Sequence, residues 1–155
     1  MGRPLRTLEA GGYYRVTARG NGGRAIFLDD RDRKLFLRLL IEARRRGRLR
    51  LHCWCLMTTH YHLVVELREV RLSRAMQYLN GVYARRFNAR HGLRDHMFGE
   101  RFASAPIETE EHLHHAIAYV LENPVRAGIV ASYEDWRWSG RVRVAPRPMA
   151  VREAA

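Results

Sequence analysis

The stretch from Arg48 to Leu67 most strongly limits the fold that this chain can adopt. It contains the segments RLRLHCWCLM and HYHLVVEL, which are joined through Thr58-Thr59. Runs of β-branched and aromatic residues favour extended strands, and a short turn between two strands joins them as an antiparallel hairpin. The chain therefore has to contain a β-sheet, and its remaining segments have to cover or extend that sheet.

The segments on both sides of the hairpin predict two further strands and three helices. YYRVTAR at Tyr13–Arg19 is a β-rich run that stops at GNGG, and a fourth strand fits Arg101 to Ile107. Apolar residues recur at helical spacing in three segments, which are 30–46, 73–90 and 110–122. The order of these elements predicts an α+β, ferredoxin-like (split βαβ) antiparallel sheet with helices on one face and an additional C-terminal helix.

Local signals set the expected ends of these helices. Asp29 and Asp30 can cap the first helix, and Gly47 is expected to end it. Thr109 can cap the last helix, and Asn123-Pro124 is expected to end it, because proline disfavours helical geometry in the residue before it.

Length and composition predict one domain with a core of its own. The chain has 155 residues, of which 46% are hydrophobic. We expect residues 10–130 to form this domain, and the Trp/Arg/Pro-rich residues 131–155 to contact DNA or to be disordered towards the end. Neither a secretory signal nor a membrane span is readable, so the expected location is the cytoplasm, in association with the nucleoid. Cys53 and Cys55 are expected to be buried thiols.

The charge of the chain favours a polyanionic partner. Its formal net charge is +12, and Lys34 is the only lysine among 28 basic residues. A genome rich in G and C accounts for arginine in place of lysine, but not for the surplus of charge. Arginine holds phosphate bidentately and stacks on bases, so a nucleic acid is the favoured partner. The candidate DNA-binding residues are Arg19, Arg44, Arg45, Arg46, Arg85, Arg86, Arg101 and Arg126.

The second strand of the hairpin carries a candidate metal site. His60 and His62 lie two residues apart, so on a strand both imidazoles point to one face while Tyr61 and Leu63 point to the other. Two imidazoles can hold one divalent metal, although the pair by itself is weak evidence.

The last predicted helix offers the further groups that such a site needs. Its polar stripe contains Tyr119 and Asn123 one turn apart, opposite an apolar stripe of Leu113, Ala116, Ile117, Val120 and Leu121. A phenol beside a metal-bound phosphate can attack phosphorus, and the asparagine oxygen is a candidate metal ligand. Tyr119 as an ordinary surface tyrosine is the competing interpretation.

Three segments together resemble a known family. YRVTARGN at 14–21, WCLMTTHYHLVVE at 54–66 and YVLENPVRAGIV at 119–130 are similar to the single-tyrosine HUH transposases, and most of all to the REP-associated tyrosine transposases. The resemblance implies an enzyme that binds a single-stranded DNA hairpin, nicks beside it and holds the 5′-phosphate as phosphotyrosine. It also implies that His60, His62 and Asn123 bind Mg²⁺ or Mn²⁺, and that Tyr119 is the nucleophile.

The sequence departs from the family pattern at a few positions. Tyr61 stands where an aliphatic residue is usual, Thr59 where asparagine is common, and Arg15 where the opening strand usually has histidine. The usual tail motif appears as WRWSG at 136–140. These differences bear on hairpin binding more than on the chemistry.

Two alternatives remain open at this point. Cys53, Cys55, His60 and His62 form a structural zinc site if their side chains converge. The second alternative is a non-catalytic protein that binds hairpin DNA or RNA and in which Tyr119 stacks on a base. The sequence leaves open whether the chain is a monomer or a homodimer.

Overall fold

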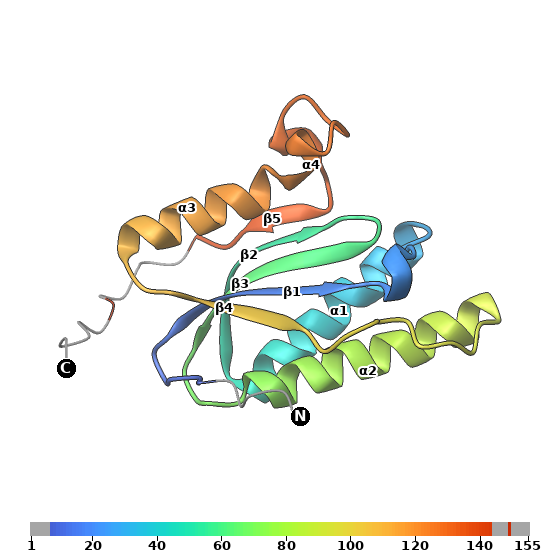
Figure 1. Cartoon of the computed structure of the whole chain (residues 1–155), viewed down its shortest axis with the longest axis horizontal. Coiled ribbons are helices and arrows are strands. Elements are labelled where there is room, and N and C mark those ends of the chain that lie inside the picture. The colour runs from blue at the N-terminus through green and yellow to red at the C-terminus, as the bar shows by residue number, and fades with distance from the viewer. Residues whose placement is uncertain (1–6, 144–148, 150–155) are drawn as a thin grey trace.

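The computed structural model describes residues 7–143 and residue 149, and it contains one five-stranded sheet with helices on both faces (Figure 1). The strands are β1 (Tyr13–Arg19), β2 (Leu49–Leu56), β3 (His60–Leu67), β4 (Ala103–Ile107) and β5 (Ser139–Arg141). The α-helices are α1 (Asp30–Gly47), α2 (Leu72–His91), α3 (Glu110–Leu121) and α4 (Asn123–Arg126).

The strand order confirms the fold expected from the sequence. The sheet runs β4-β1-β3-β2-β5, and all its pairings are antiparallel. Strands β4-β1-β3-β2 have the order of a ferredoxin-like sheet. Because β5 is added beyond β2, the hairpin β2-β3 and strand β1 are the three inner strands of the complete sheet. Helices α1 and α2 cover one face, and α3 crosses the other face (Figure 1).

Each face of the sheet has its own apolar core. The larger core lies under α1 and α2, where the fully buried rings of Phe36, Tyr61 and Tyr83 meet. The smaller core lies under α3 and contains the five apolar residues of the stripe predicted for that helix. The alternation along β3 therefore divides its side chains between two buried layers, and His60 and His62 are on the side of α3.

Helix α1 starts as predicted but ends differently. The Asp29 carboxylate accepts a hydrogen bond from the backbone N–H of Asp32 at 3.0 Å, which caps the helix. The left-handed residue that ends the helix is Arg48, with φ 49°, and not Gly47. Gly47 is needed for packing instead, because a Cβ there would lie 2.5 Å from the Cβ of Ala75 on α2.

The chain after α3 is more structured than its sequence indicates. Helix α3 ends at Leu121 and, after Glu122, the chain continues as the single turn α4, in which Pro124 occupies the first turn. Beyond it, β5 pairs with β2 at the edge of the sheet, and the nearby Trp138 is buried in the larger core. Part of the predicted tail, up to Arg143, is thus built onto the sheet. The remainder of that tail, apart from Met149, lies outside the described residues.

Candidate metal and nucleophile site

His60 and His62 begin β3 and present their imidazoles together. Their ring centroids are 4.9 Å apart, and the ring planes are nearly perpendicular. Between them, Tyr61 points into the opposite core, where its hydroxyl donates a hydrogen bond of 2.7 Å to the Oδ1 of Asn80. The strand alternation thus places the two imidazoles on one face as expected. It also places the Tyr61 phenol on the opposite face of the sheet, away from the site.

Each imidazole is oriented by a threonine hydroxyl. The Nδ1 of His62 lies 3.0 Å from the Oγ1 of Thr17, its partner across the sheet on β1, and the Nδ1 of His60 lies 3.0 Å from the Oγ1 of Thr59. In the tautomer whose Nδ1–H donates to the threonine oxygen, this hydrogen bond fixes the ring and leaves Nε2 as the nitrogen that can bind a metal. Thr59 therefore helps to orient the imidazole of His60.

The surroundings keep both imidazoles neutral. Burial, the neighbouring His60 and the positive charges of Arg15, Arg19 and Arg126 lower the pKa of His62 to about 3. Burial and Arg19 also lower the pKa of His60, against a hydrogen bond with Asn123 that raises it. A neutral imidazole is the form that binds metal, so the pair is in its ligand form at physiological pH.

Tyr119 lies beside this pair at the end of α3. Its ring centroid is 6.1 Å from that of His62, and 43% of the residue is exposed. The guanidinium of Arg15 lies 4.8 Å from the ring centroid and that of Arg126 lies 4.1 Å from it. The exposed phenol is therefore next to the imidazoles and in contact with two positive charges.

Asn123 and Arg126 reach the site from α4. The Asn123 side chain is close enough to His60 to form the hydrogen bond noted above, and its Nδ2 approaches the Tyr119 carbonyl oxygen at 3.5 Å. Arg126 also donates a hydrogen bond to that carbonyl. Helix α4 thus ties Asn123 to both the histidine pair and the tyrosine.

The two cysteines do not take part in this cluster. Cys53 and Cys55 are fully buried in the smaller core as free thiols, and burial raises the pKa of each to about 12. In the part of the chain that the structure describes, no three His, Cys, Asp or Glu side chains converge to hold a metal ion. The four residues of the zinc alternative are therefore not brought together.

The structure separates the eight candidate DNA-binding arginines. Arg19 and Arg126 lie at the site, where both influence the pKa of His62. Arg44, Arg45 and Arg46 end α1, and Arg85 and Arg86 are exposed on α2. Arg101 is exposed just before β4. Sequence reasoning missed Arg15 as a member of the site, although its place on β1, two residues before Thr17, was the available signal.

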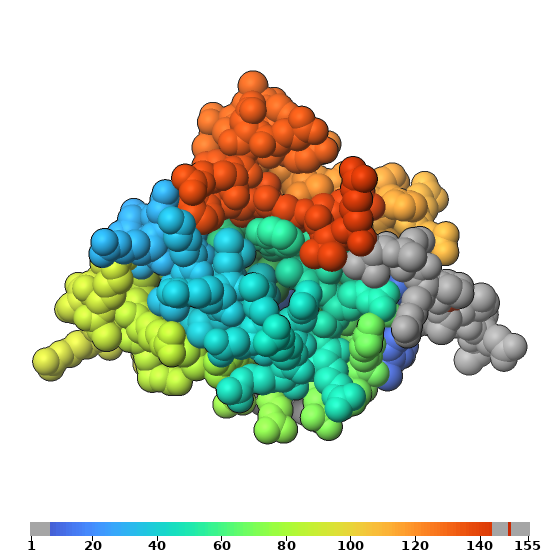
Figure 2. Space-filling model, turned by 180° about the vertical axis from the view of Figure 1, so that it is seen from behind, coloured from blue at the N-terminus to red at the C-terminus, as the bar shows by residue number. Residues whose placement is uncertain are grey.

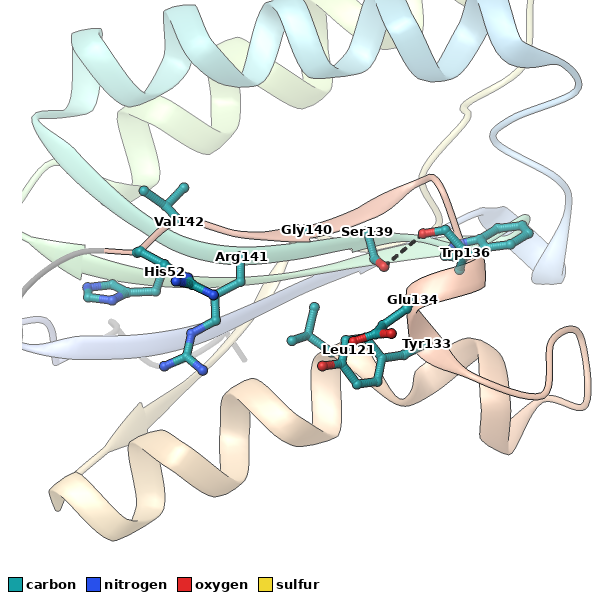
Figure 3. A pocket seen from close by; sticks show the side chains of 10 residues that line it. His52, Leu121, Tyr133, Glu134, Trp136, Ser139, Gly140, Arg141 and Val142 are labelled. Atoms are coloured by element: carbon teal, nitrogen blue, oxygen red, sulfur yellow. Dashed lines mark hydrogen bonds between the residues drawn. The ribbon is translucent and has the colours of Figure 1, made fainter.

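A cleft near α4 was also not predicted. It has a volume of about 640 Å³ and lies between the end of α3 and the strand β5 (Figure 3). Tyr133 and Glu134 line it from one side, and His52 and Arg141 line it from the sheet. Three of its six remaining lining residues, Trp136, Ser139 and Gly140, belong to the WRWSG segment.

Comparison with known proteins assigns the chain to a family. The family model described as "Transposase IS200 like" matches residues 11–123, which include both histidines, Tyr119 and Asn123. The chain belongs to the IS200-like transposase family. No curated protein sequence matches this transposase, and none of the described helices of this transposase has the length and apolarity needed to span a bilayer.

Two solved structures show the same fold as this transposase. One is a REP-associated tyrosine transposase bound to a REP hairpin, with a TM-score of 0.75, 19% identity and full coverage of both chains. The other is a protein from Deinococcus radiodurans R1 assigned as a transposase, with a TM-score of 0.51 and 17% identity. It matches 79% of this chain and 97% of its own length.

Proposed function

We propose that this transposase is a metal-dependent single-stranded DNA endonuclease and strand transferase that acts at hairpin-forming repeats. The observation that carries the proposal is the convergence of Tyr119 on the His60–His62 pair, within a sequence that matches a transposase family. Hairpin binding by the REP-associated structural neighbour supports the choice of substrate. We place its activity in the cytoplasm, on the DNA of the nucleoid.

The residues at the site fit a small divalent cation. His60 and His62 offer two neutral imidazoles held through Nδ1, and Asn123 adds an amide oxygen. Three nitrogen and oxygen donors suit Mg²⁺ or Mn²⁺ when phosphate oxygens complete the ligand set. Such an ion would neutralise charge that develops on the phosphate and would lower the cost of forming a phenolate.

Tyr119 supplies the nucleophile in the proposed reaction. Its phenol oxygen bonds to the phosphorus as the phenol releases its proton to solvent and the bond from phosphorus to the 3′ oxygen breaks, and the released 3′ oxygen takes up a proton from solvent. The products are a 5′-phosphotyrosine and a free 3′-hydroxyl. Attack by a 3′-hydroxyl on the phosphotyrosine reverses these bond changes and joins the strands, so the reaction consumes no nucleotide cofactor.

The other polar groups position the reacting atoms. Arg15 and Arg126 hold the Tyr119 ring and place positive charge where the phosphate has to approach. Arg19 lies opposite His60 in the β1-β3 register, at the same edge of the site. We assign these arginines to binding the phosphates that flank the nick.

The proposal is tested with a labelled single-stranded hairpin incubated with manganese. Wild-type protein should form a covalent complex that survives denaturing electrophoresis, and Tyr119→Phe should lose both the complex and nicking while it keeps hairpin affinity within about twofold. Equal cleavage by Tyr119→Phe would identify another nucleophile. Hairpin binding without cleavage by either protein would favour the non-catalytic binding protein.

A further inference from the structure

A second concentration of positive charge lies away from the site, where α1 ends, β2 begins, β3 ends and α2 begins. Residues 42–50 and 66–74 contain eight arginines and three glutamates. The resulting surplus of five positive charges is a large part of the formal net charge of +12. We call this surface the arginine pole, and define it by Arg44, Arg45, Arg46, Arg48, Arg50, Arg68, Arg71 and Arg74.

The arginine pole is concave. One hollow, of about 850 Å³, is lined by arginines of α1, β2 and Arg68, and another, of about 410 Å³, is lined by Arg46 and arginines of α2. The teal and green surface in the lower half of Figure 2 contains the chain segments that form them. A concave, arginine-lined surface fits a phosphate backbone better than it fits a flat membrane.

Glu69 links the two hollows and orders their arginines. Its carboxylate holds the Nε of Arg48 at 3.1 Å and the Nε of Arg71 at 2.7 Å. Because both ion pairs use Nε, the terminal nitrogens of each guanidinium can still bind a phosphate oxygen. The two arginines are thus held apart on either side of one carboxylate, facing different hollows.

The hollows of the pole offer positive charge without an open aromatic ring on which bases can stack. Among the described residues that line its hollows, Tyr78 is the only aromatic one. The Arg46 guanidinium covers the Tyr78 ring at 4.3 Å from its centroid, and the Tyr78 hydroxyl donates a hydrogen bond to Glu42. Single-stranded DNA is usually held by bases stacked on open aromatic rings, so this surface is better suited to paired DNA, whose base faces are stacked inside the helix and whose phosphates lie on its outside.

The position of the pole separates it from the candidate nicking site. His60 starts β3, and Arg68 directly follows its last residue, Leu67. Seven residue steps of about 3.3 Å place the two ends of the strand about 23 Å apart. The pole is thus too far from Tyr119 to contact the phosphates immediately beside the nick.

We propose that the arginine pole binds the backbone of a duplex DNA segment that is separate from the single strand held at Tyr119. This inference depends on the proposed function only for the choice of DNA as the polyanion. A protein with two such surfaces can keep hold of chromosomal duplex while it cuts or joins a strand. The charge of the pole, its shape and its covered aromatic ring all support this assignment.

The test is fluorescence anisotropy with a labelled, blunt 20-base-pair duplex in EDTA. The variant Arg68→Gln/Arg71→Gln/Arg74→Gln should bind the duplex at least tenfold more weakly than wild type. The slope of log affinity against log salt concentration should also be shallower for this variant, by about 2 to 3. Each lost phosphate contact removes about 0.9 from that slope.

The matched control removes the same charge elsewhere. Arg31, Lys34 and Arg94 are exposed and lie outside the pole, so Arg31→Gln/Lys34→Gln/Arg94→Gln should keep the duplex affinity of the wild type within about twofold. Excess unlabelled 20-nucleotide oligothymidine should not displace the duplex from wild-type protein. A pole variant that keeps its salt dependence, or complete displacement by the single strand, would overturn the inference.

Two further outcomes identify what has failed. Binding of the pole to vesicles of anionic lipid, with no duplex binding, would show a membrane surface instead and would also overturn the inference. Because the assay contains no metal and measures no cleavage, duplex binding by a protein that never nicks a hairpin would leave the inference intact and would contradict only the proposed function.

Discussion

Among the residues that contact Tyr119, Arg15 is the one whose role is easiest to test by mutation. Its guanidinium lies against the tyrosine ring, and its charge also acts on His62. Because Arg15 comes from β1 and Tyr119 from α3, this contact joins two elements far apart in the sequence.

We predict that Arg15→Met slows single-turnover nicking about tenfold, which is about 1.4 kcal/mol of lost stabilisation of developing negative charge. Methionine keeps much of the length of the side chain and removes the charge. Arg15→Lys should recover most of the rate, because the charge is kept. Equal rates for the methionine variant and the wild type would show that Arg15 only packs against the ring.

His62 makes the stability of the metal-free protein depend on pH. Its pKa is about 3 in the folded chain, against an ordinary value of 6.5. As the pH falls below 6.5 the unfolded chain binds a proton that the folded chain does not, so stability is lost between pH 6.5 and about 3. At pH 5 the loss from this residue is about 2 kcal/mol.

This is measured by thermal unfolding in EDTA at pH 7.5 and pH 5. The unfolding temperature of the wild type should fall by about 4–8 °C more than that of His62→Asn over this interval. Comparing the two proteins removes the contribution of every other titrating group. Parallel curves would show that His62 is protonated equally in the folded and unfolded chains.

At the scale of elements, the close packing of α1 against α2 depends on Gly47. A Cβ at Gly47 would lie 2.5 Å from the Cβ of Ala75, whereas a Cβ at Gly81 would meet only the flexible end of Arg85 at 3.5 Å. Both glycines are within helices, so alanine gains helix propensity at each. The two positions therefore differ in packing and not in backbone preference.

We predict that Gly47→Ala destabilises the protein by about 1–3 kcal/mol because the helices are forced apart. Gly81→Ala should stabilise it by up to about 1 kcal/mol. Urea unfolding followed by circular dichroism measures both changes. The same sign of change for the two variants would contradict the packing account.

The elements that the sequence predicts well are those with a regular apolar pattern. The strands of the hairpin and the helices α1 and α2 end within about two residues of their expected limits, and the buried stripe of α3 is the predicted one. These patterns are local, so a single sequence contains them. The position of Tyr61 in the opposite core follows from the same alternation.

The elements that the sequence does not reveal depend on contacts between distant residues. Strand β5 has only the residues SGR, and a Cβ at Gly140 would lie 2.4 Å from the ring of Trp54. Its place in the sheet thus comes from pairing with β2, which no local pattern encodes. The left-handed conformation of Arg48 and the contact of Arg15 with Tyr119 were missed for the same reason.

Across the molecule as a whole, three side-chain interactions hold the start of α1 and the end of α2 together beside the larger core. The buried Asp32 carboxylate lies 2.7 Å from an Arg90 nitrogen and 3.0 Å from the Nε2 of His91. Asp29, the cap of α1, also pairs with Arg90. Helices α1 and α2 are therefore held together by polar contacts of Asp29 and Asp32 at one end, and by close packing of their apolar residues elsewhere.

The layer on the other face is simpler. Helix α3 contacts the sheet mainly through β2 and β3, over the smaller apolar core. The histidine pair belongs to β3, which is hydrogen-bonded to strands on both sides, whereas the tyrosine belongs to this single covering helix. In the proposed site, the histidines are therefore held by a central strand of the sheet, whereas the tyrosine is held only by the packing of one helix against that sheet.

That difference has a consequence for how a bound strand leaves. Backbone amides in β3 should exchange with deuterium most slowly, and those of α3 and α4 should exchange through smaller, more frequent openings. Such an opening would carry Tyr119 and Asn123 away together while both imidazoles stay in place. Turnover would then be limited by the lifting of one helix from a rigid platform, and mass-spectrometric deuterium uptake can time that movement.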